Sequence, residues 1–135
     1  MQNRAIRPSD LTKELRANAL ADIPSMLWGP PGIGKSEIAY EFGDSINAKM
    51  YELRANLFDP VDVRGGLKVV EQEDGTYRTR YGVPEDYPDS NYQGAVLLLI
   101  DELHNAPKAT QNALLQLLLN KKIGTYEMPA NTIIL

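Results

Sequence analysis

The sequence has no cysteine and only one histidine among its 135 residues. The absence of cysteine excludes a disulfide framework and a thiolate metal site, and it fits a reducing compartment. No apolar run approaches the roughly 18 residues that a membrane-spanning helix needs, and the first residues lack the apolar core of a signal peptide. We therefore expect a cytoplasmic protein that does not enter a membrane.

Basic blocks are also lacking, because the 14 Lys and Arg residues are spread along the chain and the net charge is -4. A chain of this charge does not attract nucleic acid or an anionic membrane, so neither is expected as a partner. The apolar content of 43% and the charged content of 24% are ordinary for a globular protein. The length suits a single domain with one core.

What the sequence does contain is Gly-Pro-Pro-Gly-Ile-Gly-Lys-Ser at residues 29–36, which fits the phosphate-loop template at every required position. The glycines let backbone N–H groups approach a phosphate closely, and the following helix adds its positive end. Lys35 is expected to contact the β- and γ-phosphates during catalysis, and Ser36 to bind Mg²⁺. The predicted ATP-binding residues are Gly29, Pro30, Pro31, Gly32, Ile33, Gly34, Lys35, Ser36 and Glu37.

The context of this loop disfavours the alternative that it is a surface turn. The apolar run at residues 25–28 predicts a buried strand, and the apolar spacing at residues 37–42 predicts a helix. A phosphate loop lies between a strand and a helix in this order. We interpret residues 1–24 as a lead-in segment with a helix and residues 25–135 as the nucleotide-binding core.

A second group of candidate residues follows an apolar run at residues 95–100, which shows no alternation. That pattern is typical of a strand covered on both faces, and it predicts an α/β fold with a parallel sheet. Asp101 and Glu102 follow directly, at the sheet edge where such folds place chemistry. Asp101 is predicted to hold Mg²⁺ with Ser36, and Glu102 to act as general base on water. The alternative is two acids that cap a turn.

The rest of the core also shows strand and helix patterns. Strands are predicted at residues 48–56 and 132–135, and a helix from Pro107 to Asn120, with Gly124 as its stop. Residues 67–81 predict a β-hairpin, because two strand-like arms flank Glu-Asp-Gly. The hairpin is either a solvated decoration or a projecting element that contacts a partner or a translocated polymer.

The phosphate loop and the Asp-Glu pair together resemble the AAA+ ATPases. The sequence is most similar to the MoxR-like branch in Asp-Pro-Val-Asp at residues 59–62, Arg-Gly-Gly at 64–66, the hairpin, and residues 101–107. The resemblance implies a three-layer α/β/α P-loop NTPase fold, with strand order 5-1-4-3-2 and an inserted hairpin. It also implies a homo-oligomeric ring, commonly a hexamer, that binds ATP between subunits and remodels a protein client, often beside a partner with a von Willebrand factor A domain.

The same resemblance suggests roles for three further residues. Asn56 is a candidate for the polar side chain that restrains the catalytic Glu102, although it could simply cap a turn. Asn105 stands where the branch usually has Arg, so trans contacts are not carried over to it. His104 is either a helix-cap residue or a side chain near the γ-phosphate.

The sequence stops before several parts that the family needs for turnover: the fifth strand, the first sensor, the arginine finger and the helical lid. An arginine finger contributes roughly 10³–10⁵ in rate. We therefore expect this chain to bind ATP and Mg²⁺ better than it hydrolyses ATP, and the open edge of the first strand predicts self-association. Two other functions stay open, an ATP-responsive assembly module and a P-loop kinase, although the Asp-Glu pair suits water activation better than a kinase.

Overall fold

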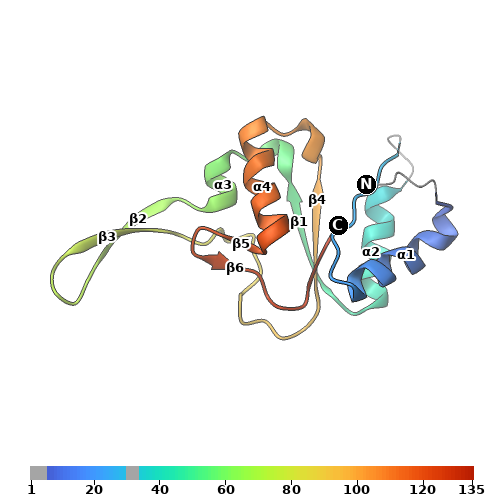
Figure 1. Ribbon diagram of the computed structural model, residues 1–135, viewed down its shortest axis with the longest axis horizontal. Coiled ribbons are helices and arrows are strands. Elements are labelled where there is room, and N and C mark those ends of the chain that lie inside the picture. The colour runs from blue at the N-terminus through green and yellow to red at the C-terminus, as the bar shows by residue number, and fades with distance from the viewer. Residues whose placement is uncertain (1–5, 30–33) are drawn as a thin grey trace.

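The protein has a parallel three-stranded sheet with helices on both faces (Figure 1). The computed structural model describes residues 6–29 and 34–135. Strands β1 (Lys49–Arg54), β4 (Val96–Asp101) and β7 (Thr132–Ile134) lie in the order β1-β4-β7. Both pairings are parallel, so the predicted α/β class with a parallel sheet is confirmed.

Two apolar clusters hold the layers together. On one face, α1 (Pro8–Leu20) and α2 (Lys35–Ser45) pack Leu15 and Phe42 against the β4 residues Leu97 and Leu99. On the other face, α3 (Pro60–Arg64) and α4 (Lys108–Asn120) lie over the sheet, as Figure 1 shows, and α4 contributes buried leucines beside Leu98. Because β4 is buried from both sides, it needs the continuous apolar run that the sequence has.

The predicted strand at residues 25–28 is wrong, because this segment has no strand conformation in the structure. Its one backbone link to the sheet is the bond from Ser25 N–H to the Ile134 carbonyl, at 3.1 Å. Pro24 has no N–H to donate, and Met26 and Trp28 are 49% and 71% exposed. The apolar run therefore lies beside β7 without the second row of hydrogen bonds that would make it a strand.

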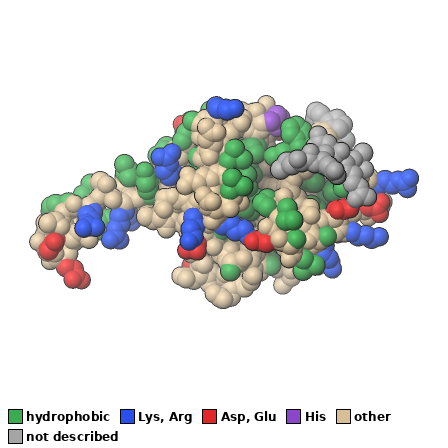
Figure 2. Space-filling view, in the orientation of Figure 1, with side chains coloured by type: hydrophobic (Ala, Val, Ile, Leu, Met, Phe, Trp, Pro, Cys, Tyr) green, Lys and Arg blue, Asp and Glu red, His purple; other side chains and the backbone are tan. Residues whose placement is uncertain are grey.

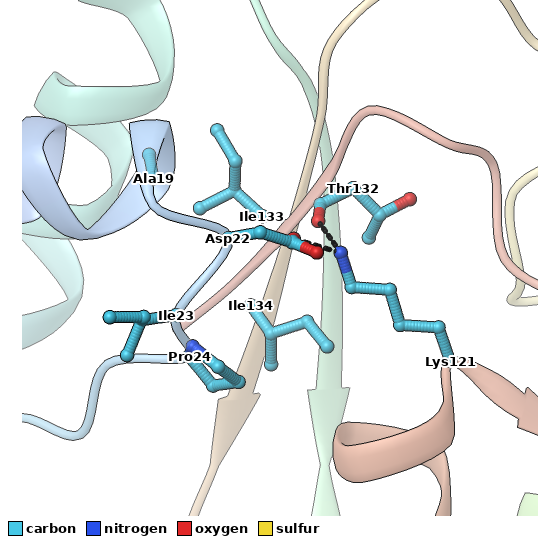
Figure 3. Close-up of a pocket in the computed structure, with 8 residues that line it drawn as sticks. All are labelled: Ala19, Asp22, Ile23, Pro24, Lys121, Thr132, Ile133 and Ile134. Atoms are coloured by element: carbon cyan, nitrogen blue, oxygen red, sulfur yellow. Dashed lines mark hydrogen bonds and ion pairs between the residues drawn. The ribbon is translucent and has the colours of Figure 1, made fainter.

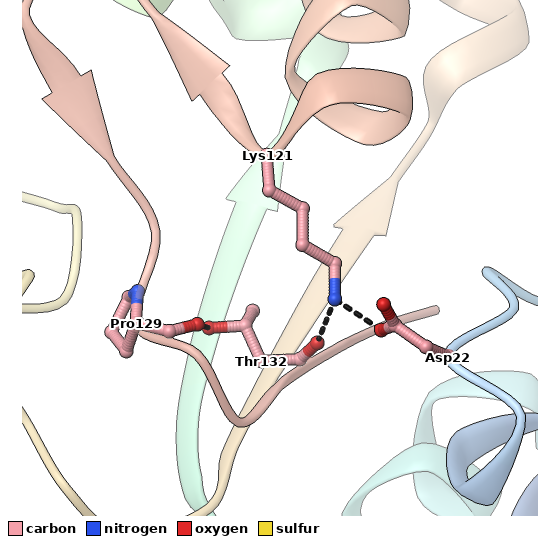
Figure 4. A network of polar contacts seen from close by, with 4 residues as sticks. All are labelled: Asp22, Lys121, Pro129 and Thr132. Atoms are coloured by element: carbon pink, nitrogen blue, oxygen red, sulfur yellow. Dashed lines mark hydrogen bonds and ion pairs between the residues drawn. The ribbon is translucent and has the colours of Figure 1, made fainter.

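An ion pair ties the turn after α1 to the end of α4 (Figures 3 and 4). Lys121, directly after α4, contacts the Asp22 carboxylate and also donates to the Thr132 carbonyl of β7 at 3.2 Å. The Lys121 side chain is only 22% exposed, whereas that of Asp22 is 73% exposed. The shallow hollow of Figure 3, between Ala19, Ile133 and their neighbours, is closed on one side by this contact.

Lys121→Met is expected to lower the free energy of unfolding by about 1 kcal/mol, because it removes two hydrogen bonds of a half-buried ammonium group and keeps the aliphatic stem. Lys122→Met is the matched control, since its pair with Glu127 is exposed on both sides. The control should change stability by less than about 0.5 kcal/mol. Urea unfolding of both variants measures the difference, and equal values would contradict the role given to Lys121.

A long hairpin projects from the body (Figure 1), made of β2 (Leu67–Glu71) and β3 (Tyr77–Tyr81). Its tip is closed by Asp74, whose carboxylate accepts hydrogen bonds from the Thr76 N–H and hydroxyl. The hydroxyl bond, and then the N–H bond, lower the pKa of Asp74. At its root, Gly65 has φ +93, and a Cβ there would lie 1.7 Å from the Gly82 carbonyl oxygen. Only glycine fits this contact.

A second, small hairpin was not anticipated from the sequence. Strands β5 (Lys122–Ile123) and β6 (Tyr126–Glu127) pair around Gly124, which has φ +56. Gly124 was expected to stop the helix before it, and this prediction is wrong: α4 ends at Asn120 and Lys121 takes the left-handed cap position. Glycine is favoured at the first turn position of a two-residue hairpin loop, which accounts for its place.

The loop between β3 and β4 is anchored by two tyrosines. The rings of Tyr87 and Tyr126 lie 4.8 Å apart, and their hydroxyls donate to the carbonyls of Val63 and Pro88. Burial raises the pKa of Tyr126 to about 12. Within the part of the chain that the structure describes, no helix is long and apolar enough to cross a membrane.

Candidate nucleotide site

The last two residues of the phosphate-loop motif, Lys35 and Ser36, are the first two residues of helix α2. Gly34 is the N-cap of α2 and has φ 81 and ψ 29, a left-handed conformation that glycine adopts at little cost. Pro30, Pro31, Gly32 and Ile33 lie outside the described residues, so their predicted contacts stay predictions. The N-terminus of α2, with its free N–H groups, follows the loop directly.

Lys35 and Ser36 occupy the first turn of α2, where both are half-buried. The Lys35 ammonium group donates to the Gly29 carbonyl at 2.9 Å, so it reaches back across the span of the loop. Glu37 is exposed, and one of its carboxylate oxygens lies 3.2 Å from where a Cβ of Gly34 would be. The side chain that is expected to contact the phosphates is thus hydrogen-bonded to the first residue of the motif.

The two candidate carboxylates lie where β4 ends. Asp101 is the last residue of β4, and its Oδ1 accepts a hydrogen bond from the Glu102 N–H at 2.9 Å. Glu102 has φ 57 and ψ 29, which is uncommon for a residue with a side chain and costs conformational energy. Both residues are half-buried. Glu102 therefore ends the strand and begins the short turn that follows it.

A hydrogen bond of Tyr40 ties α2 to β1, the strand that pairs with β4. The Tyr40 hydroxyl donates to a carboxylate oxygen of Glu52 on β1 at 2.6 Å. This bond, followed by desolvation and the charge of Glu52, raises the pKa of Tyr40, and the charge of Asp101 acts in the same direction. In the same region, Phe42 of α2 belongs to one apolar cluster with Leu99 of β4, two residues before Asp101.

Asn105 supplies a contact that sequence reasoning missed. It ends η2 (Leu103–Asn105), and its side-chain amide donates to the Glu102 carboxylate oxygen Oε2, while its backbone N–H donates to the Glu102 carbonyl at 3.0 Å. The i to i+3 spacing after a strand was the available signal, because a short turn brings such side chains together.

Asn56, which was predicted to restrain Glu102, lies exposed on η1 (Ala55–Leu57). The η1 and η2 turns are in contact, so Asn56 is close to the Glu102 turn. The hydrogen bond to the carboxylate, however, comes from Asn105. His104 is exposed on η2.

Among residues 6–29 and 34–135, no three His, Cys, Asp or Glu side chains are grouped so as to hold an ion. Mg²⁺ is commonly bound by one or two protein ligands together with water and phosphate oxygens, and Ser36 and Asp101 suit that mode. None of the candidate residues lines the hollow of Figure 3.

A family model decides the relationship of the chain: the model described as "MoxR domain in the MoxR-vWA-beta-propeller ternary systems" matches residues 1–132. The chain belongs to the MoxR-like AAA+ ATPases. The resemblance inferred from the phosphate loop and the Asp-Glu pair is therefore confirmed. Membership of this family supports an ATPase core in general terms.

Among solved structures, this MoxR-like chain is similar to the crystal structure of NtrX from Brucella abortus. The two share 22% identity with a TM-score of 0.48, and the match covers 90% of this chain and 29% of that one. The chain thus spans less than a third of the protein that it matches. No curated protein sequence matches it.

Proposed function

We propose that the chain binds ATP with Mg²⁺ and hydrolyses it as the core of a MoxR-like remodelling ATPase. The observation that carries the proposal is the packing of two elements: α2, which begins with the motif residues Lys35 and Ser36, shares an apolar cluster with β4, which ends in Asp101. Phosphoryl transfer needs such positioning and charge stabilisation more than covalent chemistry from the protein.

The described residues fit ATP and Mg²⁺ by their chemistry. The left-handed Gly34 leaves the loop free of a Cβ beside the helix N-terminus, where an anion is favoured. Lys35 would exchange the Gly29 carbonyl for phosphate oxygens, which form stronger, charge-assisted bonds. Ser36 and Asp101 would hold Mg²⁺, a Lewis acid that neutralises charge on the phosphates. Glu102 would accept the proton of the attacking water.

The proposed protein partners rest on the family to which the chain belongs. The matching model comes from systems that combine MoxR, a von Willebrand factor A domain and a β-propeller. A partner with a von Willebrand factor A domain is therefore part of the proposal, as is a ring, commonly a hexamer, that remodels a protein client. A ring is consistent with an ATP site that other subunits complete.

The experiment that tests the proposal uses the single tryptophan, Trp28, which directly precedes the phosphate loop and is 71% exposed. Titration with Mg²⁺ and ATP should give a saturable change in its fluorescence, together with retention of radiolabelled ATP on a filter. A chain that retains no ATP at millimolar concentration would overturn the proposal. Phosphate release, measured alongside, reports turnover.

Asn105→Ala is expected to raise ATP turnover, by up to roughly tenfold, because it frees the Glu102 carboxylate from a hydrogen bond that competes with water. ATP affinity should stay the same, since Asn105 contacts the carboxylate and not the phosphate loop. Phosphate release at saturating ATP measures the effect, in a form of the protein that shows turnover.

Asn56→Ala is the matched control for this prediction. It removes the same amide from the neighbouring turn η1, which packs against η2. If Asn105 restrains Glu102, only Asn105→Ala raises turnover. If Asn56→Ala raises it and Asn105→Ala does not, the restraint belongs to Asn56 as the sequence suggested.

A further inference from the structure

The β2–β3 hairpin stands away from the body (Figure 1) and contacts it only near its root. Its root is held by the Gly82 N–H bond to the Gly66 carbonyl, at 2.8 Å, and by the Thr125 hydroxyl bond to the Tyr81 carbonyl, at 2.9 Å. Most of its side chains are exposed. A two-stranded ribbon with a closed tip therefore presents both of its faces to other molecules.

One face of this ribbon is cationic. The register places Lys68 directly opposite Arg80, and Arg78 opposite Val70 on the same face. Like charges directly opposite each other destabilise a two-stranded sheet. In the described part of the chain, no carboxylate forms an ion pair with any of the three. Figure 2 shows Lys and Arg side chains along the projection and acidic ones at its tip.

The other face carries several large apolar side chains, together with Glu71 and Thr79. Leu67, Val69 and Tyr77 alternate with the cations along the two strands and are 65%, 68% and 67% exposed. Exposed large apolar side chains gathered on one element mark an interaction site more often than scattered ones do. Each strand of the ribbon has one neighbour only, so its outer backbone groups have no strand partner.

These observations favour an extended peptide over nucleic acid. The exposed Tyr77 lies on the face opposite the cations, so a base could not stack on it while its own phosphates contacted them. The net charge of -4 also opposes a polyanion. A third strand at an edge, by contrast, would direct alternate side chains to the two faces and meet both at once.

We propose that the β2–β3 hairpin docks an extended partner segment in which acidic and apolar residues alternate. The segment adds as a strand, with its carboxylates facing Lys68, Arg78 and Arg80 and its apolar side chains facing Leu67, Val69 and Tyr77. Its backbone supplies the hydrogen bonds that the open edge lacks. The proposal is independent of ATP binding and turnover.

The test uses a fluorescent peptide of about eight residues that alternates Glu and Val. Anisotropy should show saturable binding that weakens as ionic strength rises from about 0.1 M to about 1 M, where the screening length falls from about 10 Å to about 3 Å. A peptide of the same composition with its Glu residues in one block should bind at least roughly tenfold more weakly. A third peptide keeps the alternating sequence but has every second backbone nitrogen methylated, so it cannot donate all the backbone hydrogen bonds of an added strand. It should bind as weakly as the blocked peptide.

Arg80→Glu is the informative variant, because it places Glu opposite Lys68 and replaces a repulsive pair with an attractive one. The hairpin should keep its fold while the peptide affinity falls by roughly tenfold or more. Arg16→Glu on α1 makes the same change in net charge at an exposed site elsewhere and should leave affinity unchanged.

Three results would overturn the proposal. The first is no saturable binding of the alternating peptide, or equal affinity for the blocked one. The second is tighter binding of a single-stranded oligonucleotide, lost in Arg80→Glu, which would make the ribbon a nucleic-acid surface. The third is a change of oligomeric state in Arg80→Glu without a change in peptide affinity, which would assign the ribbon to a second copy of the chain.

Discussion

Glu102→Gln is expected to abolish ATP hydrolysis, by roughly 10²–10⁴-fold, and to leave ATP affinity unchanged. The amide cannot accept the proton of water, which removes the general base. The structure predicts that the variant keeps its fold. Gln has the same length, its oxygen can still accept from Asn105, and the left-handed backbone at φ 57 is no more strained than with Glu.

The measurement compares phosphate release with retention of labelled ATP, in a form of the protein with measurable turnover. Glu73→Gln at the exposed hairpin tip is the matched control and should change neither quantity. Equal turnover in Glu102→Gln and the wild type would reject the role given to Glu102. Loss of ATP retention in Glu102→Gln would instead assign this carboxylate to binding.

Lys35→Ala should lower ATP affinity by about 1.5–3 kcal/mol, or roughly 10- to 150-fold, because it removes the charge-assisted bonds to the phosphates. Titration followed by Trp28 fluorescence measures the loss of affinity. Trp28 directly precedes the motif in the sequence and is exposed, so the substitution at Lys35 leaves the probe itself in place.

Lys13→Ala on α1 is the control for this substitution. Lys13 is an exposed lysine on a helix that packs against α2, and it is remote from the loop in sequence. Its replacement should leave ATP affinity within about twofold of the wild type, as expected for a screened surface charge. Unchanged affinity in Lys35→Ala would count against the phosphate-loop assignment itself.

The sequence predicted the fold best where a residue pattern is compatible with only one kind of structural environment. The apolar run of β4 requires cover on two faces, and the structure supplies it from α2 and α4. Pattern reasoning failed at residues 25–28, where hydrophobicity was taken to imply a ladder of hydrogen bonds that the structure does not form. It also failed at Gly124, because a glycine after a helix can serve either a cap or a hairpin turn.

Side-chain partners were the least predictable part of the candidate site. Asn105 and Asn56 have the same chemistry and both follow strands of the sheet, so composition cannot choose between them. The deciding feature is the left-handed backbone of Glu102, which turns its side chain toward a residue of its own turn. That conformation follows from how η2 joins β4 to α4, which depends on the fold and not on a local motif.

The close approach of Gly65 to Gly82 has a mechanical consequence. The Glu102 turn contacts η1, the chain passes from there through the capped helix α3, and Gly65 fixes the end of α3 against the root of the β2–β3 hairpin. The connection between them is short, so a change in the orientation of α3 would be passed directly to the root of the hairpin. A small tilt of α3 that follows events at the carboxylates would swing the far end of the ribbon through a larger arc, and would carry any bound segment with it.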